Sequence, residues 1–295
     1  MELQKEKDGF IPPVTLTAGC KINLYLRVTG RREDGYHTLE SLFIPLPSPT
    51  DTLTVSRNSE EGLSFSCSVP ALERSPGTVH KAYALYTDAS RYRPGLHVRL
   101  EKGIPMGTGL GGGSSDAAAL LLYLEKLAQE DGRAPLGPER LAGLAARIGA
   151  DVPFFLHNTP SLVSGIGEKI VATENPFKGS FLLLLCPEIH VSTAWAFATF
   201  DEDLRQIAES GLTLSAGKDS TSFVHGVRLQ NDLETVVFRK HPKLAELRKS
   251  LLAHGAYAAR MSGSGASLFG LFTSRREAED ARAATPGVVT YLHEL

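Results

Sequence analysis

Several features are scarce or missing in this chain, and each absence removes a class of function. Only three cysteines occur in 295 residues, far apart and in no CxxC or mixed Cys/His spacing, which argues against a disulfide framework or a structural zinc site. The nine histidines show no HxxxH or HExxH pattern. We therefore expect reduced thiols and no zinc chemistry.

Neither an excess of one charge sign nor a long apolar run is present. The net charge is −2 and the pI is near 6.5, so no global basic field exists to hold nucleic acid or an anionic membrane surface. The longest apolar run, residues 117–124, is far below the roughly 20 residues that span a bilayer, and no apolar run follows the charged N-terminal segment. We expect a cytoplasmic protein, a monomer or weak homodimer, with no nucleic-acid or membrane partner.

Hydrophobic periodicity predicts a mixed α+β protein. Alternation in residues 21–28 and 96–100 predicts strands in the first hundred residues, with one helix over 79–92. From residue 114 the spacing of the leucines becomes helical, and the second half again mixes strands and helices. We divide the chain into two domains, 1–160 and 161–295.

A glycine-rich segment is the strongest local signal of function. Residues 105–119 read PMGTGLGGGSSDAAA, with five glycines in seven positions directly before a predicted helix. Backbone amides without side chains approach a phosphate closely, and the positive end of the helix favours the anion. An ordinary flexible loop with a helix cap is the alternative. The residues predicted to bind ATP are Pro105, Met106, Gly107, Thr108, Gly109, Leu110, Gly111, Gly112, Gly113, Ser114 and Ser115.

Two other kinds of phosphate-binding protein are disfavoured. Gly107, Gly109 and Gly112 match the loose pattern GxGxxG of dinucleotide-binding oxidoreductases, but the helix leads into another predicted helix instead of the strand and acidic residue which that fold requires. The pattern GxxxxGK[ST] of P-loop enzymes occurs nowhere in the chain.

Together with two further segments, the glycine-rich segment makes the chain resemble the GHMP kinase family. The three segments occur in the same order as the motifs of that family. Residues 21–24 (KINL) resemble its opening strand, the glycine-rich turn its second motif, and residues 262–266 (SGSGA) its third. Further segments are similar to members that phosphorylate the 2-hydroxyl of a methylerythritol carried on cytidine diphosphate, in the non-mevalonate route to isoprenoid precursors. These segments are RREDGYH at 31–37, GADVPFF at 149–155, GIGE at 165–168 and NDLE at 231–234.

The resemblance implies a two-domain α+β GHMP kinase fold with the active site in the interdomain cleft. It implies ATP and Mg²⁺ as cofactors, Asp151 as the base that accepts the proton of the substrate hydroxyl, and Lys21 as the group that supports the attacking oxygen. From spacing alone, a capping or turn residue is the more common use of an aspartate such as Asp151, and a solvated or edge residue that of a strand lysine such as Lys21. The resemblance leaves the magnesium ligands unassigned.

For the cytidylyl substrate, the resemblance implies contacts from both halves of the chain. An aromatic face stacks on a base, and small residues let the backbone approach phosphates. The alternatives are helix packing for Phe197, a hairpin turn for Tyr36 and His37, and a tight turn for the two glycines. The residues predicted to bind the substrate are Asn23, Tyr36, His37, Phe197, Gly263 and Gly265.

Two departures from the family pattern and two rival functions remain. Residues 18–20 (AGC) stand where Ala-Pro-Ala is common, and residues 77–81 (GTVHK) lack an asparagine often found near the adenine, so the adenine contacts are unassigned. The rivals are a kinase of the homoserine or mevalonate type and a non-catalytic binding module of the same fold.

Overall fold

The computed structural model describes residues 12–74, 77–209, 222–224 and 226–295. The first part of the chain forms β1 (Val14–Arg31), β2 (His37–Arg57), β3 (Gly62–Cys67), α1 (Pro70–Glu73), α2 (Thr78–Ser90), β4 (Gly95–Glu101), α3 (Gly112–Glu130), α4 (Pro138–Ile148), α5 (Val152–His157), β5 (Ser161–Gly165) and β6 (Lys169–Ala172). The second part forms β7 (Phe181–Cys186), α6 (Thr193–Glu209), β8 (Ser222–Val224), β9 (Val227–Leu229), α7 (Glu234–Lys240), α8 (Pro242–Ala253), β10 (Ala258–Met261), β11 (Leu268–Phe272), α9 (Arg275–Ala283) and β12 (Val289–Glu294).

A long antiparallel hairpin of β1 and β2 organises the first sheet. The two strands pair from Val14 with Val55 to Arg31 with His37, and three register shifts interrupt the ladder. Such irregularities bend a strand and increase its twist. The later part of β2 pairs with β4 and its earlier part with β5, so the sheet runs β3-β4-β2-β5-β6 with β1 beside β2.

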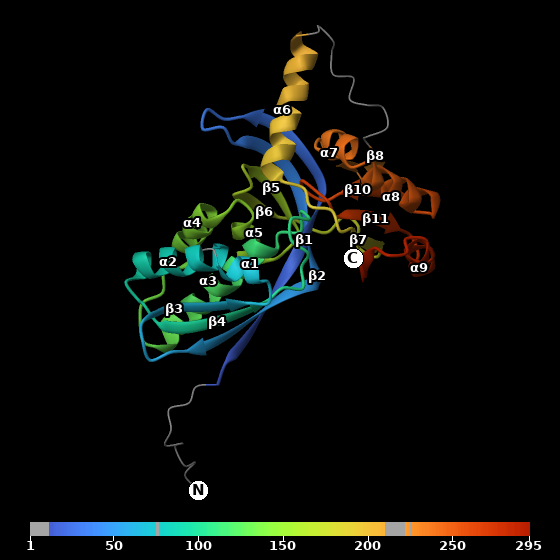
Figure 1. Cartoon of the computed structure of the whole chain (residues 1–295). Coiled ribbons are helices and arrows are strands. Elements are labelled where there is room, and N and C mark those ends of the chain that lie inside the picture. The colour runs from blue at the N-terminus through green and yellow to red at the C-terminus, as the bar shows by residue number, and fades with distance from the viewer. Residues whose placement is uncertain (1–11, 75–76, 210–221, 225) are drawn as a thin grey trace.

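Helices α2 to α5 cover one side of this sheet and bury its first core. Helix α3 is central, because it packs on α2, α4 and α5 and also contacts β1. Its inward face carries Leu120, Leu121, Leu124 and Leu127, which are almost completely buried, as the helical spacing predicts. Figure 1 shows these helices grouped on the N-terminal half of the molecule.

The second sheet is antiparallel and has the order β10-β11-β7-β12. Helices α8 and α9 contact its strands, and α7 packs on α8. Helix α6 projects from this half toward the tip of the β1–β2 hairpin (Figure 1). The second half therefore contributes both a sheet core and a helix that reaches the first half.

A third buried cluster joins the two sheets. Residues Ile22 and Leu24 of β1 pack with Leu184 of β7 and Phe269 of β11, and Leu110 of the glycine-rich turn lies in the same cluster. All five side chains are at most 1% exposed. Because the strand that carries Lys21 and the glycine-rich turn share one core, their relative positions are set by close packing.

The α+β class is confirmed, and the predicted elements differ mainly in length. Helix α3 begins at Gly112 with Gly111 as its N-cap and no side-chain cap, so Ser114 lies inside the first turn. Strand β5 pairs with β2, and β6 pairs with β5, so the first sheet extends across the proposed division at residue 160, which stays a prediction. In the described part of the chain, no helix is both long and apolar enough to cross a membrane.

Candidate active site

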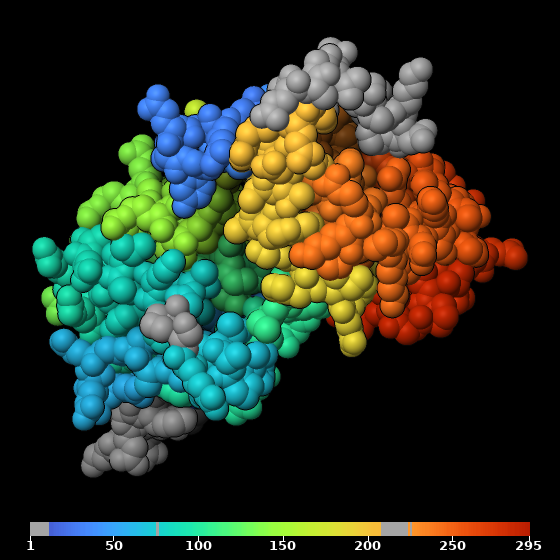
Figure 2. All heavy atoms as spheres, turned by 45° about the horizontal axis from the view of Figure 1, so that its top comes forward, coloured from blue at the N-terminus to red at the C-terminus, as the bar shows by residue number. Residues whose placement is uncertain are grey.

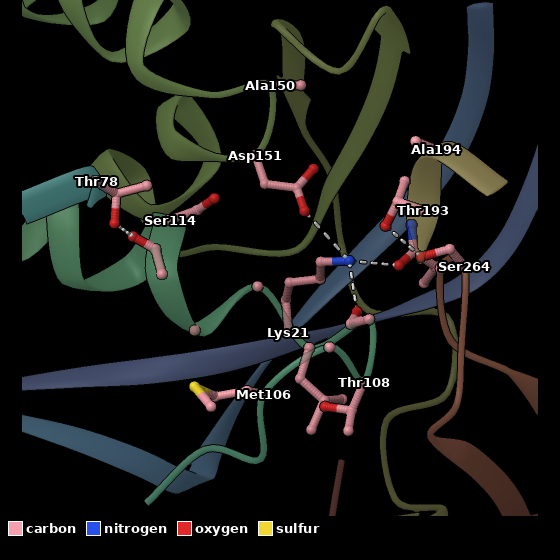
Figure 3. A pocket seen from close by; sticks show the side chains of 18 of the residues that line it. Lys21, Thr78, Met106, Thr108, Ser114, Ala150, Asp151, Thr193, Ala194 and Ser264 are labelled. Carbon is pink, nitrogen blue, oxygen red and sulfur yellow. Dashed lines mark hydrogen bonds and ion pairs between the residues drawn. The ribbon is translucent and has the colours of Figure 1, made fainter. Parts of the chain in front are cut away.

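Lys21 lies on β1 and is only 3% exposed. Its Nζ donates hydrogen bonds to Asn23 Oδ1 at 2.6 Å and to the carbonyl oxygen of Gly109 at 2.9 Å, and it lies 3.4 Å from Asp151 Oδ2 (Figure 3). A buried ammonium is tolerated only when it is paired and hydrogen-bonded. The solvated-strand alternative for Lys21 is therefore wrong, and the lysine joins three separate segments of the chain.

Asp151 immediately precedes α5, at the N-cap position of that helix. Its side chain makes no capping hydrogen bond and is 31% exposed. The capping alternative is therefore wrong for the side chain. The carboxylate instead faces Lys21 and lines the cavity, so it is accessible from the cavity.

The glycine-rich turn requires glycine for two physical reasons. Gly109 and Gly111 have φ values of +78° and +79°, a region that side chains disfavour. A Cβ on Gly109 would also lie 2.2 Å from the carbonyl oxygen of Ser262. The turn is held from β1 by a hydrogen bond from the Lys21 amide to the Leu110 carbonyl, at 3.0 Å.

The third motif packs directly against the other two. Ser262 Oγ accepts a hydrogen bond from the Asn23 amide at 3.1 Å and donates to the Gly109 carbonyl at 3.3 Å. Gly263 lines the cavity, whereas Gly265 does not and lies against Met261 instead. The structure thus brings the three sequence motifs together around Lys21.

The NDLE segment acts behind this contact, a role that the sequence did not reveal. Asn231 Nδ2 donates to the carbonyl oxygens of Met261 at 2.8 Å and Gly263 at 2.7 Å. Glu234 accepts from the Met261 amide at 2.7 Å, and its burial raises the pKa of its carboxyl. These bonds fix both ends of the turn that touches Gly109.

A buried ionic cluster, which the sequence analysis also did not predict, lies beneath the glycine-rich turn. Lys102 Nζ hydrogen-bonds to Asp51 and lies 2.9 Å from Asp116 Oδ2. Asp51 Oδ1 also accepts from the amides of Gly103 and Ile104, at 2.7 and 2.8 Å. With one lysine for two carboxylates, burial raises the pKa of Asp116, and Lys102 opposes that rise.

The predicted base-binding residues meet at the other end of the site. The rings of His37 and Phe197 stack with centroids 4.7 Å apart, and Tyr36 beside them is 60% exposed. Thr193, at the start of the same helix, hydrogen-bonds through its hydroxyl to Ser264 at 2.7 Å. Helix α6 is therefore tied to the third motif through Thr193 at its start and to the hairpin through Phe197 one turn later.

One cavity of about 1100 Å³ is lined by Lys21, Asp151, the glycines of the glycine-rich turn and the His37–Phe197 pair. Figure 2 shows the surface hollowed between the N-terminal half and α6. Its far end is apolar, lined by Phe65, Leu72, Val79 and Leu100, and Thr78 Oγ1 there donates to the Gly113 carbonyl at 2.6 Å. Of the predicted site residues, only Ser115 and Gly265 do not line this cavity.

Two side-chain oxygen atoms beside the glycine-rich turn are suitable ligands for a hard cation. Ser115 Oγ and Asp116 Oδ1 are buried and lack a hydrogen-bond partner within the described ranges. Mg²⁺ prefers such oxygen ligands and is usually held by one or two protein groups together with phosphates. The described residues hold no cluster of three or more His, Cys, Asp or Glu side chains suited to a metal ion.

Comparison with known proteins gives concordant results. The family model described as the N-terminal domain of GHMP kinases matches residues 77–159, and the model of the C-terminal domain matches residues 202–286. A 4-diphosphocytidyl-2-C-methyl-D-erythritol kinase of Nitratidesulfovibrio vulgaris strain Hildenborough is 48% identical over 286 residues, which cover 96% of this chain and 99% of the relative. A protein of the same name from Solidesulfovibrio magneticus is 42% identical and covers 94% of each chain.

Solved structures agree with the sequence relatives. A crystal structure of 4-(cytidine 5'-diphospho)-2C-methyl-D-erythritol kinase superposes with a TM-score of 0.70 at 32% identity, covering 95% of this chain and 98% of the other. A homoserine kinase from Cytophaga hutchinsonii shares the fold, with a TM-score of 0.67 at 18% identity and coverage of 99% and 96%. The matches to both domain models and to relatives along nearly the whole chain show that this protein belongs to the GHMP kinase family.

Proposed function

We propose that this protein is an ATP-dependent kinase that phosphorylates the 2-hydroxyl of 4-diphosphocytidyl-2-C-methyl-D-erythritol, in the non-mevalonate route to isoprenoid precursors. The observation that carries the proposal is the arrangement of one cavity. The pair Lys21–Asp151 lies between a glycine-rich turn at one side and the aromatic pair His37–Phe197 at the other. Relatives that bear this activity in their names match nearly the whole chain.

The glycine-rich turn is the site for the triphosphate of ATP. Residues 105–115 supply closely approachable backbone and the N-terminal end of α3, which favour an anion. The apolar end of the cavity, with Phe65, Val79 and Leu100, suits the adenine ring. Mg²⁺ bound with the nucleotide neutralises charge on the β- and γ-phosphates, and Ser115 and Asp116 are its candidate protein ligands.

Asp151 and Lys21 handle the proton and the charge of the attacking oxygen. Asp151 accepts the proton of the substrate hydroxyl while that oxygen forms a bond to the γ-phosphorus and the bond to ADP breaks. Lys21 Nζ, 3.4 Å from Asp151 Oδ2, stabilises the negative charge that develops on the oxygen. Asn23 and the Gly109 carbonyl hold the ammonium in place.

The substrate is tested by offering several alcohols to the purified protein with Mg·ATP and measuring ADP release. The panel contains 4-diphosphocytidyl-2-C-methyl-D-erythritol, its cytidine-free analogue, homoserine and mevalonate. We expect turnover only with the cytidylyl substrate, because the aromatic pair then has a base to bind. Turnover with homoserine or mevalonate instead would support the kinase activity but contradict the proposed substrate. No turnover with any alcohol would indicate a non-catalytic module.

Loss of either ionisable group should slow the chemical step. Lys21→Ala and Asp151→Ala are each expected to lower kcat by roughly 10² to 10⁴, the usual scale for one acid–base group. Steady-state kinetics on variants whose circular dichroism matches the wild type provide the measurement. A kcat within a factor of about three of wild type in either folded variant contradicts the role given to that residue.

The contact between the two turns should be intolerant of a single methyl group. Gly109→Ala places a Cβ where the Ser262 carbonyl lies, and we expect kcat/KM for ATP to fall by about tenfold to a hundredfold, the scale of backbone strain.

Gly143→Ala is the matched control, since Gly143 is exposed in α4 with open space around its Cα. The control should keep wild-type kinetics and gain about 0.5 to 1 kcal/mol in stability. Equal kinetics in both variants would show that the approach of the two turns is not required for nucleotide binding.

A further inference from the structure

A carboxylate at the base end of the cavity has no part in the reaction proposed above. Asp201 lies on α6, and its side chain is 12% exposed. Its Oδ1 is 2.7 Å from Nε2 of His37 at the start of β2, and its Oδ2 is 3.1 Å from Nη1 of Arg31 at the end of β1. One side chain of the second half thus holds both strand ends of the hairpin that α6 approaches in Figure 1.

The bond to Asp201 determines which nitrogen of His37 carries a proton. An ionised carboxylate only accepts hydrogen bonds, so Nε2 must donate. In the neutral imidazole, a proton on Nε2 leaves the lone pair on Nδ1, so a partner on one ring nitrogen sets the tautomer.

Nδ1 of His37 is available to a ligand. It has no hydrogen-bond partner among the residues that the structure describes. It is also absent from the fully buried polar atoms that lack a partner, so it is not fully buried. The residue lines the cavity together with Arg31 and Asp201. An acceptor nitrogen is therefore open to the site.

The orientation of the ring is fixed on a second side. Phe197 stacks on His37 with an interplanar angle of 21°, and it lies one turn before Asp201 on α6. Residues four apart share one face of a helix. A single turn of α6 therefore supplies both the stacking face and the hydrogen bond that hold the imidazole.

We propose that Asp201 is a positioning residue for base selection: it orients His37 so that Nδ1 accepts a hydrogen bond from the exocyclic amino group of cytosine. Uracil presents a carbonyl oxygen at that position and has no proton to donate. Asp201 itself touches neither the base nor the reacting atoms. This inference rests on the proposed function, because it needs a cytidylyl substrate in the cavity.

The test uses Asp201→Asn in the full chain. An amide accepts through its oxygen or donates through its nitrogen, so it no longer enforces a proton on Nε2. We expect the KM for the cytidylyl substrate to rise about tenfold, the scale of one hydrogen bond to a charged group, with the KM for ATP unchanged. We also expect the ratio of kcat/KM for the cytidylyl over the uridylyl substrate to fall, whereas Asp201→Glu restores part of both values.

Asp203→Asn is the matched control on the same helix. Asp203 pairs with Arg239 and does not line the cavity, so this variant should keep the wild-type KM values and base preference. An unchanged substrate KM in Asp201→Asn, an unchanged base ratio, or an equal rise in the KM for ATP would each overturn the inference. Failure of the proposed function is separate, because it appears as a wild-type protein that does not phosphorylate the cytidylyl substrate.

Discussion

The buried ammonium of Lys21 is the interaction on which the arrangement of the site depends. Removing an ammonium from water costs several kcal/mol unless its partners are well placed. Here the partners come from β1 itself, from the glycine-rich turn and from the residue before α5. The cost of leaving this charge unpaired therefore holds three segments in register, and it places a carboxylate and an ammonium together beside the turn that we propose binds phosphate.

The two halves of the molecule meet through backbone as much as through side chains. Gly109 lies so close to the Ser262 carbonyl that no side chain fits between them, and Asn231 holds the carbonyls on both sides of Ser262. A shared core of β1, β7 and β11 residues lies next to this contact. The cavity between the halves is consequently bounded by packed, hydrogen-bonded elements, which suits chemistry that depends on alignment.

Local patterns in the sequence predicted the parts of the structure that local physics controls. The helix α3 and the glycine-rich turn before it follow from the leucine spacing and from the freedom of glycine, and the burial of Leu120, Leu121, Leu124 and Leu127 agrees. The proposed roles of Lys21 and Asp151 came from the resemblance to the family. By spacing alone, a lone lysine in a strand also fits a solvated residue, and an aspartate between Gly149 and Pro153 also fits a capping or turn residue. Contacts such as Lys102–Asp51 and His37–Asp201 join residues 51 and 164 positions apart, and no periodic signal encodes such pairings.

The central claim is that Lys21 and Asp151 act as one unit on the attacking oxygen. A double-mutant cycle tests it most directly, with kcat measured for wild type, Lys21→Ala, Asp151→Ala and the double variant. Residues that work together show strongly non-additive effects, so the double variant should be slower than the slower single variant by no more than about threefold. If the two losses instead multiply, the residues act independently and the account of the site is wrong.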